Sequence, residues 1–298
     1  VCIHTKKIYD SCKDKDCIED LRFYPAQNCQ AVIDRAVSIK AGKAELIYVY
    51  IDVEPIGFNR GSLLVMPTAG ALDVDYRNYG SAYTGQTASP GYYSNLLTKY
   101  GIRTEVTATP RTSAERYTFP EGTGHILLNL GEGLTNESGA WVRRVSDTEV
   151  EGMKLLGTFC YNPQAVFPVY FVMRVSKRPA ATGFWKKQPP KQGVEAEWDK
   201  DAGNYKLYTQ YGKDIAGDDV GVWFSYDMQP GEQVEVRMGV SFVSAENARL
   251  NLEAEQQGRS FDDIRAAARR TWNDDLGRIR VEGGTEAQKK VFYTGLYH

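Results

Sequence analysis

Between residues 63 and 243 the sequence is a succession of short segments rich in β-branched and aromatic residues, and turn sequences such as Ser-Pro-Gly at 89–91 separate them. No helical periodicity lies between the segments, which favours an antiparallel sandwich over a parallel sheet. We therefore expect a mainly β protein, an antiparallel β-sandwich with C-terminal helices and a small α+β N-terminal segment. The predicted strands are Leu63–Met66, Tyr92–Leu97, Arg103–Ala108, Ala114–Phe119, His125–Leu130, Trp141–Val150, Val169–Ser176, Tyr205–Tyr208, Val220–Tyr226 and Gln233–Val243.

After Val243 the period of the apolar residues changes from two to about three and a half, which indicates helices. Ser244 and Ser260 are predicted to cap the first two, because a serine hydroxyl accepts hydrogen bonds from the free amides at a helix start. A third helix is expected from Thr285, and its pattern still runs at Tyr297. We therefore expect a sandwich domain with flanking helices over 62–280, and over 281–298 the start of a linker helix toward a further helical domain that this sequence lacks.

The first 61 residues differ in character from the rest. They hold four of the five cysteines, at positions 2, 12, 17 and 29, and the fifth is Cys160. The spacing does not suit a zinc site, so free or locally paired thiols are the favoured interpretation. A short helix over 28–40 and a strand over 44–53 are expected. Residues 1–61 are thus predicted to be an α+β leader separate from the sandwich.

Charge and composition limit the classes of binding partner and of catalytic site that the sequence suggests. Lys and Arg number 36 against 38 Asp and Glu, a net charge of −2, so the chain as a whole gives no electrostatic reason to bind nucleic acid or an acidic membrane. No apolar run reaches the roughly 18 residues of a spanning helix, and no signal peptide is visible. With only three histidines, catalysis would have to depend on carboxylates.

Four segments, in matching order and spacing, resemble the N-terminal domain of glycoside hydrolase family 92, the exo-acting α-mannosidases. They are Leu-Val-Met-Pro-Thr at 64–68; Ala-Ser-Pro-Gly-Tyr-Tyr-Ser at 88–94, running on to Arg-Tyr-Thr-Phe-Pro at 116–120; Gly-Val-Ser-Phe-Val-Ser at 239–244 with Glu-Asn-Ala at 246–248; and Val-Glu-Gly-Gly-Thr at 281–285 with Phe-Tyr-Thr-Gly-Leu-Tyr-His at 292–298. Residues 1–61 instead resemble, over a fifth of the chain, the start of an uncharacterised cysteine-rich bacterial family. We hypothesise that two unrelated gene pieces meet near Gly61 and Ser62.

The resemblance implies a galactose-mutarotase-like sandwich packed against an (α/α) helical barrel. It also implies that a calcium ion and two carboxylates in that barrel cleave terminal α-mannose with inversion, which needs one acid and one base. These groups would lie downstream of His298, so no catalytic or metal residue is assigned in this chain and its sugar-contacting residues are unknown. The implied location is periplasmic or secreted, and the implied partners are mannose-containing glycans and the catalytic domain.

A few side chains in the sandwich are candidates for catalytic, metal-binding or sugar-binding roles. Glu195, Glu197 and Asp199 beside Trp198 resemble a glycosidase pair with a sugar platform, although a solvated strand face is the favoured interpretation. The other candidates, with the favoured interpretation of each, are Asp214, Asp218 and Asp219 (an acidic turn rather than a calcium site), Trp141 (core), Trp185 (an exposed loop residue able to stack on a sugar), His125 (structural) and the Asn136 glycosylation pattern (chance).

Three functions remain open. The chain is expected to be a scaffold and partial sugar-site wall for an absent catalytic domain, inactive alone. The alternatives are a carbohydrate-binding module and an interaction protein governed by the leader.

Overall fold

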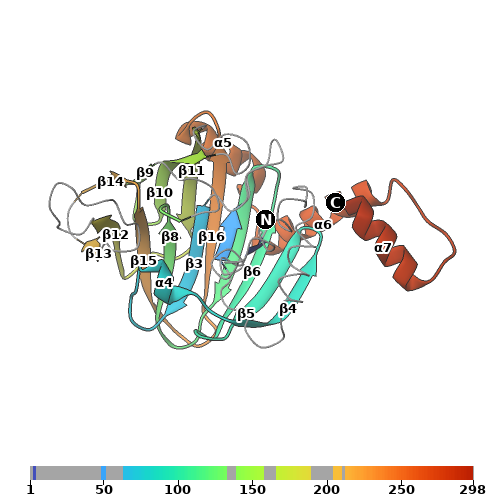
Figure 1. The fold of residues 1–298 in the computed structure, drawn as a ribbon, viewed down its shortest axis with the longest axis horizontal. Coiled ribbons are helices and arrows are strands. Elements are labelled where there is room, and N and C mark those ends of the chain that lie inside the picture. The colour runs from blue at the N-terminus through green and yellow to red at the C-terminus, as the bar shows by residue number, and fades with distance from the viewer. Residues whose placement is uncertain are drawn as a thin grey trace, which may run out of the picture.

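Two antiparallel sheets pack face to face, and helices follow them at the C-terminal end (Figure 1). The structure is a computed structural model that describes residues 63–132, 139–157, 166–188, 204–209 and 212–297, together with two short strands at 3–4 and 48–51. The expected fold class, a mainly β antiparallel sandwich with C-terminal helices, is confirmed.

The first sheet has seven strands in the order β1-β2-β3-β8-β15-β12-β13. Its strands are β1 (Ile3–His4), β2 (Tyr48–Ile51), β3 (Leu63–Ala69), β8 (Gly122–Asn129), β15 (Val220–Met228), β12 (Ala181–Gln188) and β13 (Asn204–Tyr208). The expected strand over 44–53 therefore exists as β2, and it pairs with β3 through Val49 opposite Val65. The expected helix over 28–40 lies outside the described residues.

The second sheet has nine strands in the order β14-β9-β10-β11-β16-β7-β6-β5-β4. Its strands are β14 (Asp214–Gly217), β9 (Ala140–Arg144), β10 (Glu149–Gly157), β11 (Val166–Val175), β16 (Gln233–Ser241), β7 (Thr112–Thr118), β6 (Ile102–Ala108), β5 (Tyr92–Leu97) and β4 (Tyr83–Ser89).

The prediction of one strand over Trp141–Val150 was wrong. The segment holds β9 and the start of β10, which pair antiparallel around a turn. The amide of Val145 donates to the carbonyl of Glu149 at 2.9 Å and closes this turn. The polar residues 146–148 form the reversal, because serine and aspartate are frequent in turns.

Four further strands were missed, namely the two-residue β1 and the longer β4, β12 and β14. The last three each contain glycine and alanine, and β12 adds two lysines and β14 an aspartate, all of them residue types that are depleted in strands. Pairing with neighbouring strands holds them in the sheets: β12, for example, pairs with both β15 and β13.

The main core lies between the sheets. One row of the seven-stranded sheet places Val65, Leu128, Val222 and Phe184 side by side, all of them buried. Apolar residues of the nine-stranded sheet, such as Phe171, face this row from the other side of the same core. Because side chains alternate along a strand, the neighbouring residues of each strand point to the outer faces.

Helix α4 (Tyr76–Tyr79) is short, and the three longer helices are α5 (Ala245–Gln256), α6 (Phe261–Leu276) and α7 (Glu286–Tyr297). Ser244 caps α5, and Ser260 forms a capping box with Asp263, so both predicted caps are confirmed. In Figure 1, α7 stands away from the sandwich beyond α6. Among the described residues, no helix has both the length and the apolar character needed to cross a bilayer.

Candidate functional site

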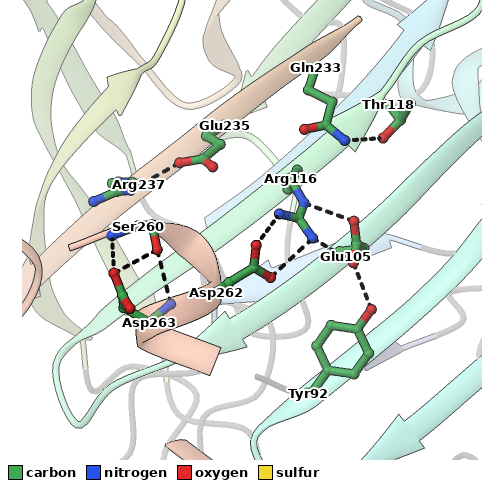
Figure 2. A network of polar contacts seen from close by, with 10 residues as sticks. All are labelled: Tyr92, Glu105, Arg116, Thr118, Gln233, Glu235, Arg237, Ser260, Asp262 and Asp263. Carbon is green, nitrogen blue, oxygen red and sulfur yellow. Dashed lines mark hydrogen bonds and ion pairs between the residues drawn. The ribbon is translucent and has the colours of Figure 1, made fainter. Parts of the chain in front are cut away.

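Polar and charged side chains gather on the outer face of the nine-stranded sheet, where α5 and α6 pack. Along this face Glu105 of β6 lies directly opposite Arg116 of β7, and Arg116 lies opposite Glu235 of β16. Residues two apart on one strand share a face, so this row continues the surface formed by Ala114. Helix α6 begins directly over this part of the sheet (Figure 2).

Arg116 holds two carboxylates at once. Its Nε and one terminal nitrogen donate to the carboxylate of Glu105 at 2.8 and 3.0 Å. The terminal nitrogens also donate to Asp262, in the first turn of α6, at 3.1 and 3.4 Å. The hydroxyl of Tyr92 adds a hydrogen bond of 2.8 Å to Glu105. The guanidinium thus ties the sheet to the start of the helix.

Aromatic and apolar contacts complete the attachment. The guanidinium of Arg116 lies 4.3 Å from the ring centroid of Phe261, and that of Arg265 lies 3.6 Å from the ring of Tyr92. A guanidinium over an aromatic face is attracted by the electron-rich ring. The same two rings, of Phe261 and Tyr92, belong to a buried cluster that also contains Ile264 and Ala114.

The charges of this group are well matched. Burial raises the pKa of Glu105, but hydrogen bonds from Arg116 and Tyr92 outweigh it and leave the pKa below its ordinary value. The hydrogen bond to Glu105 in turn raises the pKa of Arg116. Both partners therefore stay charged, and Glu105 is a poor proton donor. This arrangement is suited to docking a helix rather than to acid–base chemistry.

A tight turn brings the sheet against the middle of α6. Gly91, between β4 and β5, has φ of +77°. A Cβ at this position would come within 2.9 Å of the Cβ of Ala268 and 3.0 Å of Cδ1 of Trp272. Glycine is required here twice over, for the backbone conformation and for the close approach of the helix. We refer to Gly91, Tyr92, Glu105, Ala114 and Arg116 as the α6 docking site.

Helix α5 is attached by a separate ionic network. Arg249 of α5 reaches both Glu149 and Glu151 of β10. Arg174 of β11 joins Glu149 to Glu253 of α5, with distances of 2.5 and 3.1 Å. Both β10 carboxylates are largely buried, so the arginines compensate charges that burial would otherwise disfavour.

Several of the candidates from the sequence have a clear position. Trp185 was predicted to be exposed in a loop, and that prediction was wrong: it lies in β12 and is fully buried. Trp141 lies in β9, as a strand residue, but is only half-buried beneath Arg143. His125 is structural, as predicted: its ring nitrogens contact Ser225 at 2.7 Å and the carbonyl of Gly70 at 2.9 Å.

Asp214 and Asp218 are exposed, whereas Asp219 is buried and accepts a hydrogen bond of 3.0 Å from Tyr205. Within the described ranges, no group of three or more His, Cys, Asp or Glu side chains is placed to hold a metal ion. The remaining candidates lie outside the described residues: Glu195, Glu197, Trp198, Asp199, Asn136 and the five cysteines.

The sequence analysis missed the roles of Glu105, Arg116 and Asp262. The strands that contain Glu105 and Arg116 were predicted, and Asp262 was placed at a helix start. A usable signal was that Glu105 and Arg116 stand among small and apolar residues in adjacent strands, where unlike charges favour pairing across the strands.

Comparison with known proteins places these features in context. The model of the glycosyl hydrolase family 92 N-terminal domain matches residues 55–241. The model of the family 92 catalytic domain matches residues 247–298. No curated protein matches the sequence.

Solved structures share the fold. A family GH92 α-mannosidase from Bacteroides thetaiotaomicron, in complex with mannoimidazole, is 24% identical with a TM-score of 0.66, over 85% of this chain and 32% of that chain. A family GH92 inverting mannosidase from Bacteroides thetaiotaomicron VPI-5482 is 23% identical with a TM-score of 0.65, over 85% of this chain and 31% of that chain. The GH92 family glycosyl hydrolase ccman5 is 24% identical with a TM-score of 0.64, over 85% of this chain and 34% of that chain. The chain therefore spans about a third of the length of these structures.

Proposed function

Since the chain belongs to glycosyl hydrolase family 92, we propose that it is the N-terminal part of an α-mannosidase-like glycoside hydrolase. In this role it would serve as a scaffold for a helical catalytic domain and would form part of the wall of the sugar site. One observation carries the proposal most directly. The match to the N-terminal domain ends at residue 241, where β16 ends, and the match to the catalytic domain begins at residue 247, inside α5. The two helices that pack on the sheet thus connect the two parts.

The catalytic chemistry is proposed to lie in the part of the catalytic domain beyond these helices. An inverting glycosidase needs one carboxylic acid and one carboxylate about 6.5 to 9.5 Å apart with room for a water molecule between them. Glu105 and Asp262 instead share one guanidinium, so they are not suited to that work. We propose that the calcium implied for this family also lies in that part of the catalytic domain.

A separate carbohydrate-binding module would need exposed aromatic platforms. Of the tryptophans in the described ranges, Trp185 and Trp223 are buried, and Trp141 and Trp272 are half-buried. The described tryptophans therefore do not favour this alternative over the scaffold.

The test is hydrolysis of an aryl α-mannoside. We expect no turnover by the 298-residue chain, and calcium-dependent turnover with inversion by a product of the same gene that continues through the catalytic domain. Turnover is followed by release of the aryl group, calcium dependence by chelation and re-addition, and inversion by proton NMR of the first sugar released. Turnover by the 298-residue chain, or a longer product that hydrolyses other glycosides but no α-mannoside, would overturn the proposal.

A further inference from the structure

The Ser-Pro-Gly-Tyr-Tyr segment at 89–93 has no role in the proposed chemistry, yet it lies at the contact between the sheet and α6. A Cβ on Gly91 would clash with α6, and Tyr92 stacks under Arg265 and donates a hydrogen bond to Glu105. Its residue types therefore match the demands of helix docking. The question is what the docked helix controls.

The two helices are attached in very different ways. Helix α5 buries Ala248, Leu252 and Gln256 and is tied by Arg249 to two carboxylates of β10. Between α5 and α6 stands Gly258, with φ of +71° and open space around it. The turn itself is closed by local hydrogen bonds: the amide of Arg259 donates to the carbonyl of Gln256, and its guanidinium donates to the carbonyls of Glu255 and Asp263. Beyond this turn, the contacts that fix α6 on the sheet are those of the α6 docking site.

Among the described residues, the buried side chains of α6 all lie in its first half. Its buried residues are Phe261, Ile264 and Ala268, and the residues after Trp272 are largely exposed. Three contacts set its direction: the ionic contact at Asp262, the stacking of Arg265 on Tyr92 and the approach to Gly91. A loss of the Gly91 contact would let the distal half swing while Asp262 keeps the start of the helix in place.

The same contact extends to α7. Trp272, which touches the turn at Gly91, packs its ring against Tyr297 of α7 with centroids 4.7 Å apart. Helix α7 has no buried residue, so its position follows that of α6. Gly91, Trp272 and Tyr297 thus form a continuous path from the sheet to α7, and α6 and α7 both lie in the segment that matches the catalytic domain.

We propose that the α6 docking site sets the orientation in which the catalytic domain leaves the sandwich, with Gly91 and Arg116 as its positioning residues. This inference rests on the proposed function for its consequence in catalysis. The orientation itself is measurable in the 298-residue chain, whatever the substrate.

The first experiment compares two glycines. Gly101 also has a positive φ, of +65°, at a turn of the same sheet, but a Cβ there would meet only Pro120 at 3.9 Å. Gly91→Ala and Gly101→Ala therefore impose similar backbone strain, and only the first acts on α6. Spin labels at Leu250 of α5 and Lys290 of α7, both exposed, report the distance between the helices. They are introduced as a non-cysteine amino acid, so that the native cysteines stay unmodified.

We expect Gly91→Ala to shift and broaden the distance distribution and Gly101→Ala to leave it as in the unmodified chain. Hydrogen exchange of the α6 amides should accelerate at least tenfold in Gly91→Ala, while the strands of the sheet keep their protection. Adding Ala268→Gly to Gly91→Ala removes the nearest clashing carbon and should restore the distance in part. Equal effects of the two glycine variants, or loss of protection in the sheet together with α6, would overturn the inference.

The second experiment removes the positive charge of Arg116. Arg116→Met is compared with Lys177→Met, which breaks an ion pair of 2.5 Å with Glu232 that does not touch α6. Only Arg116→Met should alter the distance. In the longer gene product, Gly91→Ala and Arg116→Met should lower kcat at least tenfold with KM for the aryl glycoside changed less than twofold, and Ala268→Gly should recover part of the loss for Gly91→Ala. If the unmodified longer product is inactive, the proposed function fails, whereas an unchanged distance in both variants defeats this inference by itself.

Discussion

The indole of Trp185 occupies the space above Gly221 on the neighbouring strand. These two residues lie opposite each other across β12 and β15. A Cβ on Gly221 would come within 2.1 Å of Cζ2 of the indole. The absence of a side chain at one position therefore allows the complete burial of the largest side chain at the other.

Gly221→Ala should destabilise the sandwich by about 3 kcal/mol, because the ring cannot move without disturbing a close-packed layer. Urea unfolding followed by tryptophan fluorescence measures the loss. A change below about 0.5 kcal/mol would mean that Trp185 is free to move aside.

The same substitution at Gly295 should act in the opposite sense. Gly295 lies within α7, and a Cβ added there would meet no other atom within 4 Å outside the helix's own backbone. Alanine there should raise local helix stability by about 1 kcal/mol, since glycine is a poor helix former. Slower hydrogen exchange of the α7 amides is the expected result. Unchanged or faster exchange would show that α7 does not behave as a simple solvated helix.

Glu115 should make stability depend on pH. It is fully buried on the inner face of β7, with hydrogen bonds from Tyr117 and Ser113. Burial raises its pKa from 4.5 to about 7, although these hydrogen bonds oppose the rise. Between those values the unfolded chain loses the proton while the folded chain keeps it. The free energy of unfolding should therefore fall by about 3 kcal/mol as the pH rises from 4.5 to 7.

Glu115→Gln should abolish this component, and urea unfolding at several pH values tests it. Glu121→Gln, at an exposed position, is the matched control and should keep the dependence of the unmodified chain. Parallel profiles for Glu115→Gln and the control would contradict the assignment.

His125 should make the free energy of unfolding depend on pH in the acidic range. Burial lowers its pKa below 6.5, although the hydrogen bond to the carbonyl of Gly70 opposes this. The unfolded chain then takes up a proton before the folded chain does, so this contribution to stability is lost as the pH falls below 6.5. His125→Gln, measured in the Glu115→Gln background, should flatten the profile below pH 6.5. A profile that stays as steep would assign the effect to another group.

Arg249→Met should weaken the attachment of α5 by about 2 kcal/mol, because it removes charged hydrogen bonds to two largely buried carboxylates. Arg178→Met is the control: Arg178 pairs with Asp147 at the surface, 79% and 59% exposed, and its removal should cost about 0.5 kcal/mol or less. Thermal unfolding and hydrogen exchange of α5 separate the two. Equal losses would mean that the buried network adds nothing to α5.

Local features were predictable from the sequence. The strand Tyr92–Leu97 was predicted with its observed bounds, because a Pro-Gly turn precedes it and turn residues follow. The caps at Ser244 and Ser260 were predicted because a hydroxyl at a helix start acts within three residues. In both cases the determining residues are neighbours in the chain.

Contacts between distant segments were not predictable. Arg116 and Asp262 are 146 positions apart, and neither neighbourhood indicates the other. Trp185 stands between a glycine and two lysines, a local sequence typical of a loop. Its burial involves Gly221, which lies on a later strand and leaves room for the indole.

The strand order has a consequence for how the protein is made. Strand β16 joins β11 to β7 in one sheet, and β15 joins β8 to β12 in the other. These two consecutive strands, which end at residue 241, are therefore the last of the sandwich to leave the ribosome, and each closes a gap in the middle of its sheet. Until then the nascent chain carries half-sheets with unpaired inner edges, which are prone to aggregate. We expect pulse proteolysis of stalled nascent chains to show a protected sandwich only once residue 241 has cleared the exit tunnel.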